Sequence, residues 1–196
     1  MSKLYFNYST MNAGKSTQLL QTAHNYRERG IKVYLITAEV DNRSGGGVIS
    51  SRIGIKMDAD TFNSDSNLYE MIEKKVEDES IQVVLIDEVQ FLKKEQVWQL
   101  ACIVDDLKIK VFCYGLRLDF QGNMFEGSTS LMSWADTIKE VITTCHCGKK
   151  ATMVIRKDDN GKAVKNGDQV QIGGNDTYVS LCRNHWRQCY GNLDNT

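Results

Sequence analysis

Residues 9–17, with the sequence STMNAGKST, place a glycine, a lysine and two hydroxyl residues side by side. In a glycine-bearing loop that opens a helix, consecutive backbone N–H groups can point at phosphate oxygens, and Gly14 permits the sharp turn. We therefore expect Lys15 between the β- and γ-phosphates of ATP and the Ser16 hydroxyl at a Mg²⁺ ion. The whole loop is expected to contact ATP and Mg²⁺: Ser9, Thr10, Met11, Asn12, Ala13, Gly14, Lys15, Ser16 and Thr17.

One position departs from the usual loop pattern G-x-x-x-x-G-K-[ST], because Ser9 stands where the first glycine is expected. A chance glycine before a helix is the alternative interpretation. However, an apolar run precedes the loop and a helical pattern follows it, which is the context that the motif requires. The context favours a phosphate-binding loop.

Two carboxylates, Asp87 and Glu88, directly follow the continuous apolar run IQVVLI at residues 81–86. Asp87 has the position of the acid that holds Mg²⁺ in proteins with this loop. A second carboxylate beside it can take a proton from the group that attacks the γ-phosphate. Attack by water would make the protein an ATPase, and attack by a hydroxyl would make it a kinase. Alternatively, the pair is a solvated strand end.

Four of the six cysteines lie between residues 145 and 189. A tetrahedral zinc site could be formed by two pairs, C-x-C at Cys145 and Cys147 and C-x-x-H at Cys182 and His185. Four protein ligands leave no open coordination position, so the expected role of Zn²⁺ is structural. His146 and Cys189 are competing ligands that the spacing does not exclude.

The composition is that of an ordinary soluble globular protein, with 41% hydrophobic residues, 25% charged residues and a net charge of -1. This charge does not favour binding to nucleic acid. No apolar run approaches the roughly 18 residues that span a bilayer, so we expect no membrane association and a cytoplasmic location. In that reducing compartment Cys102 and Cys113 are expected to be buried thiols. His24 has no assigned role.

Strand and helix patterns alternate along the first part of the chain. This alternation predicts an α/β fold with a parallel sheet flanked by helices. Apolar runs predict strands at residues 4–8, 32–38, 81–86 and 110–114. Helical periodicity predicts helices at residues 16–29, 68–76 and 97–104.

Three segments have other patterns. Residues 39–60 contain three consecutive glycines without clear periodicity, and we expect a mobile loop there that can close over a ligand. Residues 116–134 match neither the helical period nor the strand period of apolar residues. From about residue 140, two strand-like runs flank a polar hairpin tip. The sequence thus predicts a phosphate-binding domain at residues 1–139, which includes the start of a substrate-enclosing loop, and a small zinc-bearing β subdomain at 140–196.

Taken together, five blocks resemble cellular-type (type II) thymidine kinase, and its bacterial branch in particular. They are S-x-M-N-A-G-K-S-T at the loop, D-E-x-Q-F at 87–91, Y-G-L-R-x-D-F at 114–120, C-x-C and C-x-x-H. The resemblance runs nearly end to end and in the family's order. That branch also has serine at the first loop position and histidine as the last zinc ligand. The resemblance implies a RecA-like arrangement of the sheet.

The resemblance also implies an activity, transfer of the γ-phosphate of ATP to the 5′-hydroxyl of thymidine in nucleotide salvage. Glu88 would be the base, with Lys15 and Arg43 as the other catalytic residues. Asp41 and Arg43 resemble the family's D-x-R element near the metal and the γ-phosphate, and Gln90 falls with the ATP-binding group. A homotetramer or a dimer, and inhibition by thymidine triphosphate, are further implications.

By the same resemblance, residues from 116 onward form a thymidine-enclosing loop that the zinc-bearing subdomain holds. Apolar and aromatic side chains suit a pyrimidine ring. Each aromatic residue taken alone would be interpreted as core packing. The expected nucleoside contacts are Met11, Phe91, Leu116, Phe120, Phe125, Val170, Gln171, Ile172, Gly173 and Tyr178.

Two alternatives remain at this point. A kinase of another nucleoside could use the same scaffold, since aromatic residues alone do not read a methyl group. A zinc-ribbon ATPase that engages nucleic acid is the alternative from another class. From residue 145 onward there are eight Lys or Arg against five Asp or Glu, an excess too small to favour DNA.

Overall fold

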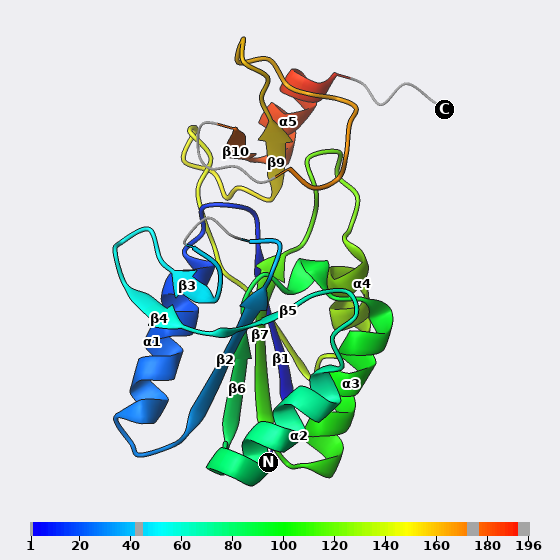
Figure 1. Cartoon of the computed structure of the whole chain (residues 1–196). Coiled ribbons are helices and arrows are strands. Elements are labelled where there is room, and N and C mark those ends of the chain that lie inside the picture. Colours follow the sequence, from blue (N-terminus) through cyan, green and yellow to red (C-terminus); the bar gives the residue numbers. More distant parts are fainter. Residues whose placement is uncertain (1, 42–44, 172–176, 192–196) are drawn as a thin grey trace.

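The computed structural model describes residues 2–41, 45–171 and 177–191. Its centre is a six-stranded sheet in the order β5-β2-β6-β7-β1-β8 (Figure 1). Every neighbouring pair in this sheet is parallel. The predicted α/β class is confirmed. The strands are β1 (Leu4–Ser9), β2 (Val33–Ala38), β5 (Asp60–Phe62), β6 (Val83–Ile86), β7 (Lys110–Leu116) and β8 (Thr137–Glu140).

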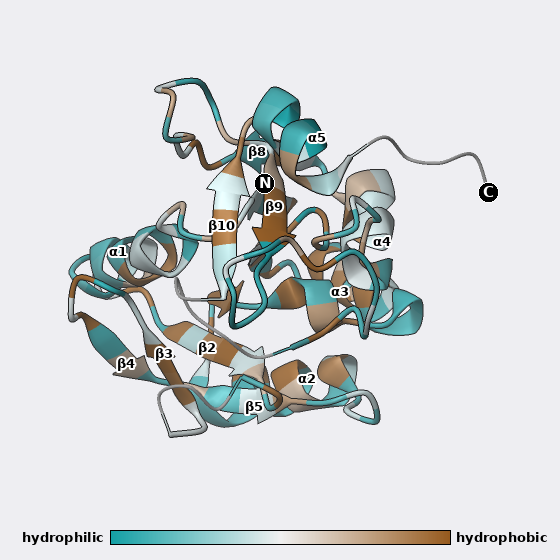
Figure 2. Ribbon diagram, turned by 90° about the horizontal axis from the view of Figure 1, so that it is seen from above, coloured by the Kyte–Doolittle hydropathy of each residue, from teal (hydrophilic) through white to brown (hydrophobic). Residues whose placement is uncertain are grey.

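Helices cover both faces of the sheet, because successive residues of its buried strands point to opposite sides. In β6, Val83 and Leu85 pack with α1, and Val84 and Ile86 pack in the larger cluster on the other face. Figure 2 shows α1 on one side of the sheet and the other helices of this domain across from it. These elements are α1 (Lys15–Arg27), α2 (Leu68–Glu79), the short η1 (Val89–Phe91), α3 (Lys94–Asp106) and α4 (Glu126–Trp134).

A small second layer lies beyond the carboxyl ends of the sheet strands (Figure 1). It consists of the antiparallel pair β9 (Met153–Arg156) and β10 (Tyr178–Leu181) and the helix α5 (Arg183–Tyr190). Its own core gathers around Trp186, which stacks on Tyr190. The zinc-bearing residues predicted from the sequence belong to this layer. We keep the division at residue 140 as a proposal.

The edges of the sheet differ from the sequence-based expectation. The patterns predict four strands, and the structure adds β5 and β8 at the two edges. Both are short, and neither carries an apolar run that could mark it as a strand. The segment expected to be a mobile loop contains the hairpin of β3 (Val48–Ser50) and β4 (Lys56–Asp58). It is held because Ile49 is buried with residues of α1.

Helix α4 lies in the segment that matched neither period. Its buried face is made largely of small residues, so no apolar stripe announces it. A Cβ on Gly127 would lie 2.4 Å from the Val89 carbonyl oxygen, which shows how closely α4 approaches η1. Helix α5 is likewise an element that the strand-like runs did not indicate. No helix in the described ranges is long and apolar enough to cross a membrane.

Candidate active site

The phosphate loop connects β1 to α1 as its motif requires. Gly14 has φ 82° and Asn12 has φ 65°, both in the left-handed region. The Lys15 ammonium group is nearly buried and donates a hydrogen bond of 2.9 Å to the Thr10 carbonyl oxygen. The loop and its lysine are therefore held in position before any nucleotide binds.

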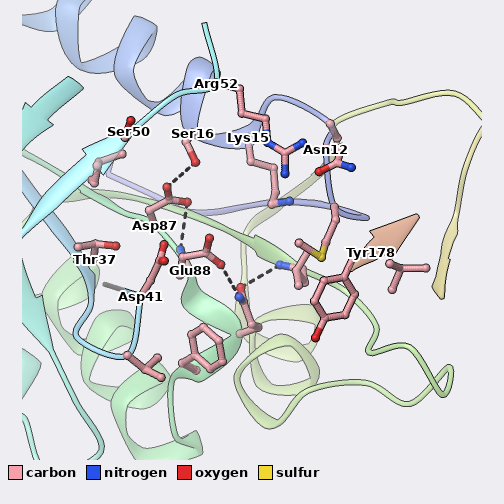
Figure 3. A pocket seen from close by; sticks show the side chains of 18 of the residues that line it. Asn12, Lys15, Ser16, Thr37, Asp41, Ser50, Arg52, Asp87, Glu88 and Tyr178 are labelled. Atoms are coloured by element: carbon pink, nitrogen blue, oxygen red, sulfur yellow. Dashed lines mark hydrogen bonds between the residues drawn. The ribbon is translucent and has the colours of Figure 1, made fainter. Parts of the chain in front are cut away.

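The acid after β6 meets the hydroxyl at the start of α1. Ser16 Oγ donates a hydrogen bond of 2.7 Å to Asp87 Oδ2 (Figure 3). The other carboxylate oxygen of Asp87 accepts from the Glu88 backbone N–H at 3.0 Å. Burial, and next the negative charge of Glu88, raise the pKa of Asp87 above its usual range. A divalent cation beside Asp87 would stabilise its buried negative charge. The oxygens of Asp87 and Ser16 are hard ligands of the kind that Mg²⁺ prefers.

Glu88 is oriented by its own backbone and by one amide. Its φ of 55° is left-handed, which is uncommon for a residue other than glycine. Gln90 Nε2 donates to Glu88 Oε2, while Gln90 Oε1 accepts from the Leu116 N–H at 3.0 Å. The Leu116 N–H needs an acceptor, so the amide oxygen of Gln90 must face Leu116. The NH₂ group of Gln90 then points to Glu88. The amide of Gln90 therefore fixes the orientation of the Glu88 side chain.

One cavity of about 810 Å³ joins the two ends of the site. Of the residues predicted for ATP and Mg²⁺, Asp41, Asp87 and Gln90 line it together with most of the phosphate loop, and Glu88 does so as well. Ser9 and Thr10, the first two residues of the loop, are buried and do not line the cavity. Predicted nucleoside contacts at the other end of the lining are Met11, Phe91, Leu116, Phe120, Phe125, Val170, Gln171 and Tyr178. Arg43, Ile172 and Gly173 lie outside the described residues.

The end of the cavity with the predicted nucleoside contacts, called the nucleoside end below, contains four aromatic rings, Phe91, Phe120, Phe125 and Tyr178. Phe91 and Phe125 meet edge to face, with ring centroids 6.4 Å apart. The Tyr178 hydroxyl donates a hydrogen bond of 2.7 Å to the Gln171 carbonyl oxygen, which fixes its ring in the lining of the cavity. Such rings offer flat apolar faces to a heterocyclic base.

The four predicted zinc ligands come together. All four ligand atoms lie within 4.8 Å of one another. Bonds of about 2.3 Å from tetrahedral zinc would put two sulfurs about 3.8 Å apart. The observed Cys147 Sγ to Cys182 Sγ distance is 3.9 Å, and His185 Nδ1 lies 3.3 Å from Cys145 Sγ and 3.4 Å from Cys182 Sγ. The donor set therefore fits a structural zinc ion.

The competing ligands are less well placed. His146 Nδ1 lies 3.7 Å from Cys145 Sγ, but its ring is exposed and is not in the four-residue cluster. Cys189 is exposed on α5. Of the two expected buried thiols, Cys113 is buried and its pKa is raised by burial, whereas Cys102 is only partly buried.

His24, for which the sequence indicated no partner, is exposed and lies 3.3 Å from Glu28 one helical turn later. The contact joins two side chains on the surface of α1, away from the residues that line the cavity.

The C-terminal layer contacts the phosphate loop directly. Ser180 Oγ, in β10, donates a hydrogen bond of 2.5 Å to the Met11 carbonyl oxygen, and Thr10 Oγ1 donates to Ser180 Oγ at 3.2 Å. Ser9 Oγ donates at 2.6 Å to the carbonyl oxygen of Val141, where the chain leaves the sheet. The serine at the first loop position thus anchors the connection between the two layers.

Sequence reasoning missed several residues around the cavity. Asp119 is buried and accepts from Gln169 Nε2 at 2.8 Å, and Arg52 lines the cavity from the β3–β4 loop (Figure 3). The block Y-G-L-R-x-D-F contains Asp119, so a signal was present there. Ser180 and Arg52 stand in segments without a recognisable motif. Their contacts depend on chain segments that are distant in sequence.

Comparison with known proteins decides the family. A model of the family described as "Thymidine kinase" matches residues 2–186. The chain belongs to the thymidine kinase family. Curated thymidine kinases of Ruegeria pomeroyi and Vibrio vulnificus are 59% and 56% identical to it over 191 residues. Each alignment covers 97% of this chain, and covers 96% and 100% of the relative. The thymidine kinase of Mannheimia succiniciproducens is 54% identical over the full length of both chains.

Membership of the thymidine kinase family confirms the expected enzyme class, a nucleoside kinase. It also agrees with the site, because a phosphate loop and an aromatic pocket share one cavity. A nucleoside kinase needs both ends, whereas an ATPase motor has no need for an apolar pocket beside its phosphates.

Proposed function

We propose that the protein transfers the γ-phosphoryl group of ATP to the 5′-hydroxyl of thymidine, giving thymidine monophosphate and ADP. The observation that carries this proposal is the single cavity lined by Lys15 and Glu88 at one end and by Phe120 and Tyr178 at the other. Its volume of about 810 Å³ is in the range of small-molecule sites that hold most of a ligand. The thymidine kinases that resemble the chain nearly end to end support the choice of nucleoside.

At the phosphate end, the backbone N–H groups of the loop and the Lys15 ammonium group would bind the phosphates. Ser16 and Asp87 would hold Mg²⁺, which supplies positive charge to the β- and γ-phosphate oxygens during transfer. Asp41 lines the same end and would assist. We propose Arg43 as a further cation for the transferred group, on the resemblance alone.

Glu88 would act as the general base. The 5′-oxygen forms a bond to the γ-phosphorus while the bond from that phosphorus to the β,γ-bridging oxygen breaks, and ADP leaves. The proton of the 5′-hydroxyl passes to the Glu88 carboxylate. Gln90 would keep that carboxylate oriented through its contacts to Glu88 and Leu116.

The nucleoside end would select a flat base and exclude water. The walls from Phe91, Phe120 and Phe125 would cover the ring, and the backbone near Gln171 would offer polar groups to its edge. Exclusion of water favours attack by the hydroxyl over hydrolysis of ATP. Zn²⁺ at Cys145, Cys147, Cys182 and His185 would hold the layer that supplies part of this wall.

The setting of the reaction is proposed on the resemblance to the family. The enzyme would serve pyrimidine nucleotide salvage and DNA synthesis in the cytoplasm, as a homotetramer or a dimer. Thymidine triphosphate is the proposed end-product inhibitor.

The test is a phosphate-transfer assay with Mg²⁺, ATP and a panel of nucleosides, run beside a reaction with ATP alone. We expect thymidine monophosphate to form, with deoxycytidine, deoxyguanosine and uridine much poorer acceptors. Rapid ATP hydrolysis without a nucleoside would favour the ATPase alternative. Preference for another nucleoside would move the proposal to a different kinase on this scaffold.

A further inference from the structure

The buried arginine at the end of β9, Arg156, lies beside the nucleoside end of the cavity but does not line it. Its side chain is 5% exposed. Arg156 pairs with Tyr178 across the antiparallel strands β9 and β10. Directly paired residues project from the same face of a sheet, so Arg156 lies beside Tyr178, which lines the cavity.

The guanidinium group of Arg156 touches two segments that enclose the cavity. Its Cζ atom lies 4.0 Å from the centroid of the Phe120 ring, and Nη1 donates a hydrogen bond of 2.8 Å to the Asp168 carbonyl oxygen. A Cβ on Gly167 would lie 2.4 Å from Nη2, so the group also fills the space beside that glycine. Nε is buried and has no hydrogen-bond partner among the described residues.

The same two segments are also joined to each other near Phe120. Gln169 Nε2 donates to Asp119 Oδ2 at 2.8 Å, and Gln121 Nε2 donates to the Lys165 carbonyl oxygen at 3.1 Å. Phe120 and Val170, from the two segments, both line the cavity. A change in the position of Arg156 would therefore move two walls of the nucleoside end at once.

The chemistry of this position suits arginine in particular. A buried cation loses hydration, and here the face of Phe120 and one carbonyl oxygen replace part of it. A guanidinium group can stack on a ring and donate within its own plane at the same time, which a lysine ammonium group cannot do. A methionine would fill much of the volume without either interaction.

We propose that Arg156 is a positioning residue for the nucleoside, which fixes Phe120 and the segment at residues 165–171 in the geometry that holds the base. The inference rests on the proposed function, since it assigns the nucleoside to the end of the cavity that contains Phe120. The phosphate end receives no contact from the Arg156 side chain in the described structure. Its loss should thus separate the binding of the two substrates.

The test compares Arg156→Met and Arg156→Lys with the wild type in steady-state assays that vary thymidine and ATP separately. For Arg156→Met we expect the KM for thymidine to rise about tenfold or more, and the KM for ATP to stay unchanged. The KM for thymidine of Arg156→Lys should lie between those of the wild type and Arg156→Met. Arg187→Met, at an exposed arginine of α5, is the matched control and should behave as wild type. Melting temperature and zinc content report whether each variant is folded.

Two results would overturn the inference. One is an unchanged KM for thymidine in both Arg156 variants. The other is a rise of both KM values together in the two Arg156 variants, with loss of zinc or a lower melting temperature even in Arg156→Lys. That result would indicate that Arg156 has a general structural role. If Arg156→Met does not fold, Arg156→Lys decides. A wild-type protein that does not phosphorylate thymidine would refute the proposed function instead.

Discussion

The two ends of the cavity are built in different ways. The phosphate end consists mostly of consecutive residues between β1 and α1, with Asp87 and Glu88 supplied by the next strand but one in the sheet. The end with the predicted nucleoside contacts is assembled from segments far apart in the sequence, around Phe91, residues 116–125, residues 169–171 and Tyr178. The first is a local structure that a short motif specifies. The second depends on the C-terminal layer being in place.

The two ends are nevertheless joined through a few hydrogen bonds. Gln90 connects Glu88 to the start of the aromatic segment at Leu116, and Ser180 connects β10 to the phosphate loop at Met11. Changes at one end should therefore affect one substrate most, and changes at these connections should affect both. The following predictions test this separation.

The largest effect is expected for Glu88→Gln. Removal of a general base costs about 10²- to 10⁴-fold in rate, so kcat should fall within that range while the KM values for ATP and thymidine change little. Steady-state kinetics with both substrates measures this. Glu77→Gln, at an exposed position of α2, is the control. Near-normal kcat in Glu88→Gln would remove Glu88 from its role.

Removal of zinc should damage one end far more than the other. A strong chelator, or Cys145→Ser, would release the ends of the C-terminal layer, because the bound metal contributes directly to folding there. We expect thymidine binding and turnover to be lost while ATP binding persists. Calorimetric titration with each substrate is the measurement. Cys189→Ser, outside the four-residue cluster, should retain zinc and activity. Loss of both thymidine binding and ATP binding, together with complete unfolding, would show that the two ends of the cavity do not fold separately.

A smaller effect is expected for Gln90→Met. This change removes the donor to Glu88 and leaves the partly buried Leu116 N–H without its acceptor on Gln90, which costs up to about 1–3 kcal/mol. Because both groups belong to the site, kcat should fall about tenfold or more. Stopped-time product assays at saturating substrates test it. A variant that keeps full kcat would show that Glu88 is oriented without this amide.

The smallest effect is expected for Ser180→Ala. Loss of one partly buried hydrogen bond to the Met11 carbonyl oxygen should cost about 0.5–1.5 kcal/mol. Thymidine and ATP should each still bind. We expect the Ser180 contact to transmit an effect of bound thymidine on ATP affinity, and this effect should be a few fold smaller in the variant, since linkage between sites is reciprocal. ATP titrations with and without thymidine measure it. Equal gains in wild type and variant would remove Ser180 from the coupling.

Much of the phosphate end could be predicted because its signals are local. Gly14 and Lys15 meet a pattern whose geometry involves only neighbouring residues, and Asp87 ends a continuous apolar strand. The cluster of Cys145, Cys147, Cys182 and His185 was also predictable, since Cys and His pairs at short spacing are typical of metal sites. The aromatic end was found by resemblance, because Phe120 alone would be interpreted as core.

Other elements carried too weak a pattern. β5 and β8 are short and lie at the sheet edges, so they need no apolar run, and α4 packs through Gly127 and serines rather than through large apolar residues. Periodicity reports buried apolar faces, and these elements have little of them.

The sequence alone predicted the loop at residues 9–17, the acid pair Asp87 and Glu88, and the cluster of three cysteines and one histidine, since residue type and spacing are sufficient for sites made of adjacent backbone groups or strong ligands. The tertiary structure decided the rest. Gln90 between Glu88 and Leu116, Ser180 on the phosphate loop, and Arg156 between Phe120 and Asp168 are contacts across more than one segment. No spacing in the chain specifies them, because they arise only when the C-terminal layer packs over the carboxyl ends of the sheet.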